Sequence, residues 1–172
     1  MRFALHLAAA WLVAAAFLAG AARAALPIEH WTTANGARVY FVRAAEIPML
    51  DVSLGFDAGG RFDPPARTGL ASLTNAMLAR GAGGLDELAI SEGFARIGAQ
   101  RGGGTSDDRA SVTVRSLTSE PELGEALALL ARVVSQPVFP AEVLAREKER
   151  VIQSLRESET KPESIAQRTF DA

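Results

Sequence analysis

Residues 69–78 read GLASLTNAML and begin a helix soon after a predicted strand. That strand, residues 49–58, alternates apolar and polar side chains with the period of two that a half-buried strand requires. We expect Thr68 to cap the helix, which continues to about Arg80. The glycine-rich residues 81–84 stop it.

Similar patterns on both sides of this pair predict the remaining elements. Residues 37–43 predict an earlier strand, which follows a turn at Asn35-Gly36. The other predictions are a helix at 86–97, a Gly-rich edge or poorly packed strand at 99–106, a strand at 110–117, helices at 123–134 and 141–159, and a last helix after 161–164. The order β-β-α-α-β-β-α-α predicts an α+β fold, with helices packed on one face of an antiparallel sheet.

The N-terminus has the composition of a secretory signal. Arg2 precedes an apolar run at 3–22, and Ala22-Arg23-Ala24 fits a cleavage site with small residues at its first and third positions. We expect residues 1–24 to be removed. A membrane anchor is the alternative, because the run is nearly long enough to span a bilayer. The cleavage-site residues favour a signal, and hence a periplasmic or secreted protein without a stable membrane anchor.

Charge and composition exclude several classes of function. The mature chain keeps sixteen basic and twenty acidic side chains and has no basic stripe, so nucleic acid and anionic membranes are not expected partners. No cysteine is present to form a disulfide or a thiolate metal site. Outside the signal, His30 is the only histidine, whereas most catalytic zinc sites need two or three. The length suits a single core.

Six stretches, taken together in their order and spacing, resemble the N-terminal domain of the insulinase/pitrilysin family of zinc peptidases. They are residues 33–39, 56–64, 69–71, 98–100, 137–140 and 146–152. Mitochondrial processing peptidase subunits and paired bacterial periplasmic subunits belong to the same family. The resemblance implies that residues 25–172 form an insulinase-like N-terminal domain. The last helix stops at Ala172 without a closing residue, so we expect the domain to be truncated at its C-terminal end.

The resemblance also implies a metal site whose residues this chain lacks. The family's inverted motif, His-x-x-Glu-His, places two zinc ligands and a general base on one helical face. The first ligand falls on Ser72, the base on Asn75 and the second ligand on Ala76. The third ligand, a glutamate on the long helix, falls on Gln153 or Ser154. Without the ligands, no zinc ion would be held to activate water, and Asn75 provides no carboxylate to accept the proton of that water. We therefore expect no cofactor in this chain.

A second implied feature is a sheet edge to which substrate peptide adds as a strand. The family usually has Asn-Ala before a hydroxyl residue there, whereas this chain has Gly102, Gly103, Gly104 and Thr105. Glycines allow close backbone approach but weaken a defined edge, so peptide binding here is an open expectation. A phosphate-binding loop is the other interpretation, but the Lys-Ser/Thr that such a loop requires does not follow.

Other candidate chemistries have simpler explanations. Ser72 has no histidine partner to activate it as a nucleophile. A turn between two strands accounts for Asp107-Asp108 better than a cation site does. Three further carboxylates on the long helix are expected to be solvated helix charges, namely Glu147, Glu149 and Glu157.

The leading hypothesis is therefore a zinc-site-degenerate subunit, or half, of a periplasmic insulinase-like metallopeptidase. It would pair with a homologous subunit that carries the zinc and help to enclose peptide substrates. A stand-alone binding or scaffold protein, which kept the fold without the chemistry, is the alternative. An active site beyond residue 172 in a longer chain is the third possibility.

Overall fold

The computed structural model describes residues 27–170 and forms two units, one ending at Ile47 and the other beginning at Pro48. The first unit is an antiparallel hairpin of β1 (Ile28–Thr32) and β2 (Arg38–Val42). Gly36, with φ +86°, turns the chain between them. Strand β1 was not predicted. The predicted signal segment and Ala172 lie outside the described residues.

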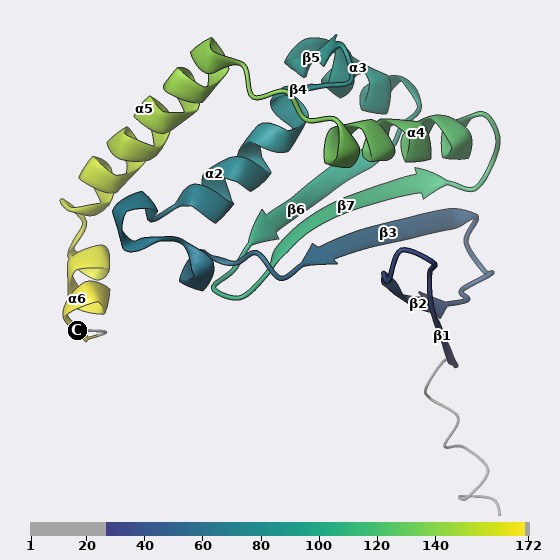
Figure 1. The fold of residues 1–172 in the computed structure, drawn as a ribbon, viewed down its shortest axis with the longest axis horizontal. Coiled ribbons are helices and arrows are strands. Elements are labelled where there is room, and N and C mark those ends of the chain that lie inside the picture. The colour runs from purple at the N-terminus through teal and green to yellow at the C-terminus, as the bar shows by residue number, and fades with distance from the viewer. Residues whose placement is uncertain (1–26, 171–172) are drawn as a thin grey trace, which may run out of the picture. The chain divides into compact units, whose positions relative to one another are not determined.

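The second unit is built on a three-stranded antiparallel sheet of β3 (Met49–Phe56), β6 (Gln100–Thr105) and β7 (Ala110–Leu117). The strand order is β3-β7-β6, so β7 is central and β6 is an edge strand, as expected. Three helices pack against the sheet, as Figure 1 shows: α2 (Leu70–Met77), α3 (Glu87–Arg96) and α4 (Glu122–Ser135). The predicted α+β class is confirmed.

Alternation along β7 explains why the helices cover one face of the sheet. Ala110, Val112, Val114 and Ser116 are buried, whereas Arg115 and Leu117 between and after them are exposed. Strand β3 repeats the pattern in the predicted phase, because its apolar residues Leu50, Val52 and Leu54 are half-buried and the polar residues between them are exposed. A period of two therefore puts the apolar side chains of both strands on the same face.

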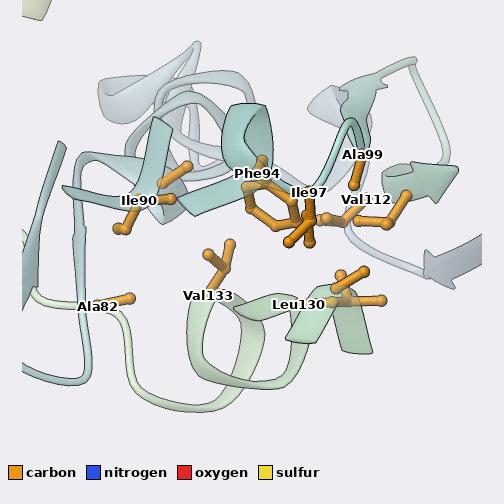
Figure 2. Packing of buried hydrophobic residues seen from close by; sticks show 11 residues of the cluster. Ala82, Ile90, Phe94, Ile97, Ala99, Val112, Leu130 and Val133 are labelled. Carbon is orange, nitrogen blue, oxygen red and sulfur yellow. The ribbon is translucent and has the colours of Figure 1, made fainter. Parts of the chain in front are cut away.

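The core lies where α3 and α4 meet this face. Figure 2 shows Phe94 of α3 beside Val112 of β7, with Leu130 and Val133 of α4 facing them. All four are at most 5% exposed. Burial of such a side chain stabilises the fold by about 1.5–3 kcal/mol. The core therefore fixes the two helices to the sheet.

Helix α2 is capped in a way that the sequence did not predict. Thr68 does not cap it; the carboxylate of Asp63 accepts the N–H groups of Gly69 (2.8 Å) and Ala71 (3.0 Å) instead. Two short turns precede the helix, η1 (Gly60–Phe62) and η2 (Pro65–Arg67). After it come η3 (Leu78–Arg80) and a short hairpin of β4 (Gly81–Ala82) and β5 (Leu85–Asp86), two strands that were not predicted.

The long charged helix α5 (Ala141–Ser158) and α6 (Pro162–Phe170) follow the sheet and its helices. Helix α5 contacts α2 (Figure 1). The apolar side chains of the second half of α5 and of α6 are exposed, at Val151, Ile152, Leu155, Ile165 and Phe170. Within residues 27–170, no helix combines the length and the apolar character needed to cross a bilayer.

Candidate functional site

Helix α2 holds the three residues on which the sequence resemblance places the inverted zinc motif. Ser72 and Ala76 are exposed, and Asn75 is half-buried. The helix contacts both β6 and β7, so a side chain on its inner side reaches the sheet backbone. Of the three residues, only Asn75 makes a hydrogen bond to the sheet.

Asn75 ties the helix to two neighbouring strands. Its Nδ2 group donates to the carbonyl oxygen of Gly104 at 3.1 Å and to that of Ser111 at 3.0 Å. These two residues are opposite each other in the β6–β7 ladder. A glutamate at this position could not donate those hydrogen bonds in its ionised form. The amide therefore has structural partners at the position where the sequence resemblance places the general base.

The residues at the implied metal positions do not fit a zinc ion. Zinc in proteins takes imidazole, thiolate or carboxylate donors, and the motif positions offer a hydroxyl, an amide and a methyl group. On α5, Gln153 is exposed and its Nε2 donates to Glu149 Oε1 at 2.7 Å; Ser154 is also exposed. Across residues 27–170, no three His, Cys, Asp or Glu side chains gather as a metal site.

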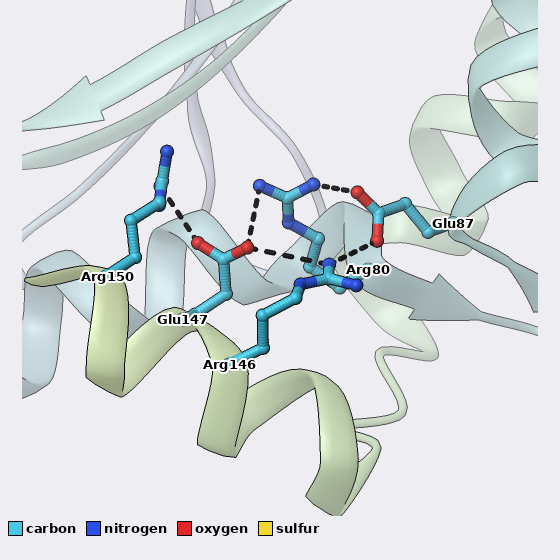
Figure 3. Close-up of polar contacts among 5 residues, drawn as sticks. All are labelled: Arg80, Glu87, Arg146, Glu147 and Arg150. Carbon is cyan, nitrogen blue, oxygen red and sulfur yellow. Dashed lines mark hydrogen bonds and ion pairs between the residues drawn. The ribbon is translucent and has the colours of Figure 1, made fainter.

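Glu147 is not the solvated helix charge that the sequence predicted, because its side chain is enclosed by arginines. The residue is 3% exposed. Figure 3 shows Oε1 facing Arg80 (3.2 Å) and Arg146 (3.5 Å), and Oε2 facing Arg150 (2.8 Å). Glu87 pairs with the first two arginines from the far side. Sequence offered one signal, since Glu147 stands on the apolar stripe of α5 between Val143 and Val151.

The glycine-rich strand β6 leaves its outer edge free of any other strand in the described part of the chain. Gly103 has φ +129°, and a Cβ there would lie 2.2 Å from the Ser111 carbonyl oxygen. A Cβ placed at Gly104 would have no neighbouring atom of the described residues within 4 Å. The Oγ1 of Thr105 is buried and has no hydrogen-bond partner among residues 27–170. This segment thus contains an obligatory glycine, an open position and one unsatisfied hydroxyl.

Asp107 and Asp108 lie in the turn that joins β6 to β7. Ser106 Oγ donates to Asp108 Oδ1 at 3.0 Å. The carbonyl oxygens of Ser106 and Asp107 accept the N–H groups of Gly60 and Arg61, at 3.0 and 2.8 Å. A Cβ at Gly59 would lie 2.2 Å from the Asp107 carbonyl oxygen, so the turn packs directly on this loop. These contacts match the predicted turn.

An apolar pocket of about 470 Å³ lies beside α2 and was not predicted. Its larger apolar lining residues are Phe56, Phe62, Leu70, Leu78 and Val134, and Asn75 also lines it. The alternation of apolar and polar residues along β3 indicated part of this pocket, because it places Phe56 on the apolar face at the end of the strand.

Comparisons with known proteins show the family and the fold. The family model for insulinase (peptidase family M16) matches residues 38–172. A solved structure described as the inactive domain of an M16 peptidase from Pseudomonas fluorescens is 42% identical, with a TM-score of 0.79, over 83% of this chain and 34% of its own. No curated protein matches.

Two more distant solved structures share the fold. A protease from Helicobacter pylori is 18% identical, with a TM-score of 0.73, over 82% of this chain and 34% of its own. The periplasmic protease PqqL from Escherichia coli is 22% identical, with a TM-score of 0.70, over 86% of this chain and 17% of its own. The chain therefore spans about a third of the length of the first two structures.

Proposed function

The chain belongs to the insulinase family of peptidases, M16, and we propose that it is a non-catalytic member that pairs with a zinc-bearing homologue. The pair would enclose peptide substrates, and the zinc and the general base would both come from the partner. This chain would contribute one wall of the enclosure and hold no cofactor of its own.

The geometry of Asn75 carries the proposal. The residue stands where the family has its general base, and both of its amide hydrogens are directed at backbone carbonyl oxygens of β6 and β7. An amide has no proton affinity near neutral pH and cannot act as a base. The position therefore serves to hold α2 on the sheet edge rather than to activate water.

The comparisons support a non-catalytic role and an exported location. The 42% identical structure is itself described as an inactive domain. PqqL is described as periplasmic, and residues 1–24 have the composition of a cleavable signal. Both observations favour action in the periplasm.

The test measures bound zinc and peptidase activity on the full chain alone and mixed with a His-x-x-Glu-His homologue from the same cell. We expect no stoichiometric zinc in the chain alone, and activity that appears or rises in the mixture. The matched control is a homologue whose motif glutamate is replaced by glutamine, which should abolish the activity of the mixture.

Two outcomes would overturn the proposal. Stoichiometric zinc in the chain alone would restore a catalytic interpretation. No association with any zinc-bearing relative, measured by copurification from the same cell, would favour the stand-alone scaffold instead.

A further inference from the structure

Arg101, the second residue of β6, is exposed and lines a small pocket together with residues of α3. It is paired in register with Val114, whose side chain is buried on that face, so Arg101 is directed to the same side. The pocket has a volume of about 340 Å³, and its polar lining residues are Arg80, Glu87, Ser91 and Arg101.

Arg101 differs from the other arginine in this pocket because no carboxylate pairs with it among residues 27–170. Arg80 is already held by Glu87 and Glu147. Partial loss of hydration, together with the nearby charge of Arg80, lowers the pKa of Arg101 from its ordinary value. A carboxylate that paired with Arg101 would favour its charged form and offset both effects.

The surroundings of the pocket carry an excess of positive charge. Arg146 and Arg150 lie beside Glu147, so four arginines face two glutamates in this region. The whole chain has a net charge of −2. A local positive field on an otherwise acidic protein favours an anionic group at this place.

The outer edge of β6 determines how such a group would arrive. A peptide that adds to a free sheet edge directs its side chains alternately to the two faces of the sheet. Every second residue of a peptide on β6 would therefore be directed to the helix-covered side, where Arg101 lies.

We propose that a peptide on the edge of β6 is selected for an acidic side chain, whose carboxylate pairs with Arg101 in the pocket beside Arg80. The planar guanidinium matches a carboxylate with two parallel hydrogen bonds. This inference rests on the peptide-enclosing role proposed above and assigns it a substrate class.

The experiment measures binding of two fluorescent ten-residue peptides to the full chain by anisotropy. Both have blocked ends; one alternates Thr and Glu, and the other alternates Thr and Gln. We expect the Glu peptide to bind about tenfold more tightly. Arg101→Gln should remove that difference in affinity. Arg101→Lys keeps the charge but loses the planar guanidinium, so it should keep only part of the difference.

Arg109→Gln is the matched control, because Arg109 is exposed in the turn at the other end of β6 and its side chain has no ion pair within residues 27–170. It removes the same charge and should leave the preference for Glu intact. Equal affinity for the two peptides, or an equal loss in both variants, would overturn the inference alone. Failure of both peptides to bind would overturn it together with the peptide-enclosing role, while association with the zinc-bearing relative remains a separate measurement.

Discussion

At the scale of single residues, the exchange of a carboxylate for an amide changes what α2 can bind. A carboxylate only accepts hydrogen bonds when ionised, whereas the Nδ2 of Asn75 donates two. The two acceptors, at Gly104 and Ser111, belong to neighbouring strands, so one side chain joins three elements. Sequence located this residue at the base position, but its partners are 29 and 36 positions away and follow only from the fold.

We predict that Asn75→Ala lowers the free energy of unfolding by about 1–2 kcal/mol, because two carbonyl oxygens lose a donor. Asn75→Asp should cost more at neutral pH, since it directs a negative charge at the same oxygens. Urea denaturation measures both changes. Thr74→Ala is the control on the exposed side of the helix, and an equal loss there would contradict the prediction.

Substitution of Glu147 tests how much its ion pairs with Arg80, Arg146 and Arg150 stabilise the fold. We predict that Glu147→Gln lowers the free energy of unfolding by about 2–3 kcal/mol, because Arg150 loses its carboxylate partner and Arg80 and Arg146 keep only Glu87, while solvent screens part of their charge. The measurement is the urea midpoint at low and at moderate salt. Glu149→Gln, on the exposed side of α5, should change little; an equal effect of the two variants would show that these ion pairs contribute nothing.

At the scale of elements, an ion pair joins β3 to β7 on the open face of the sheet. Asp51 is opposite Arg115, which donates two hydrogen bonds to its carboxylate at 2.6 and 2.9 Å. These hydrogen bonds hold the pKa of Asp51 below its ordinary value. The folded chain therefore binds this proton less readily than the unfolded chain. The stabilisation is complete above the ordinary pKa of about 4 and is lost as pH falls through the lowered pKa.

We predict that Asp51→Asn slightly lowers the unfolding midpoint at pH 7, and that the difference from the native chain disappears as the pH falls through the lowered pKa of Asp51. Thermal unfolding across this pH range measures the effect. Asp57→Asn serves as control, because Asp57 has no ion pair among the described residues. A difference that persists unchanged at low pH would disprove the assignment.

Two of the three glycines of β6 give opposite predictions. Gly103→Ala should destabilise the sheet by more than about 2 kcal/mol, because its Cβ would overlap the Ser111 carbonyl oxygen and its φ is +129°. Gly104→Ala should leave stability within about 0.5 kcal/mol, since its Cβ would meet no atom within 4 Å. Chemical denaturation of the two variants side by side decides the matter, and equal losses would contradict the strand geometry.

Periodicity predicted β3 and β7, whose two faces differ in environment, whereas the strands β1, β4 and β5 were missed. Strands β3 and β7 have one face under helices and one in solvent, so apolar and polar residues alternate. All five residues of β1 are exposed and carry no such contrast. Strands β4 and β5 have two residues each, which is too short for a period. The Asp63 cap escaped prediction because it lies six residues before Gly69, outside the usual capping position.

At the scale of the whole molecule, the chain consists of a hairpin and a helix-covered sheet joined at residues 43–48. Residues 43–47 are exposed and lie outside strands. We predict that brief trypsin treatment produces a fragment that begins at Ala44, because exposed loop backbone is the preferred substrate of proteases. Mass spectrometry identifies the fragment, and Arg43→Gln should abolish it. Survival of the Arg43–Ala44 bond after cuts within β7 or α4 would contradict this division.

Gly104 and the absence of cysteine have a joint practical consequence. Because the chain contains no thiol, Gly104→Cys creates a single attachment point for a spin label or fluorophore, at a position where the strand has room for it. The probe would lie on the face of β6 opposite to Arg101, on the same strand that the proposed peptide would contact. Arrival of a peptide would then be seen as a change in the mobility or emission of the label, without any enzymatic readout.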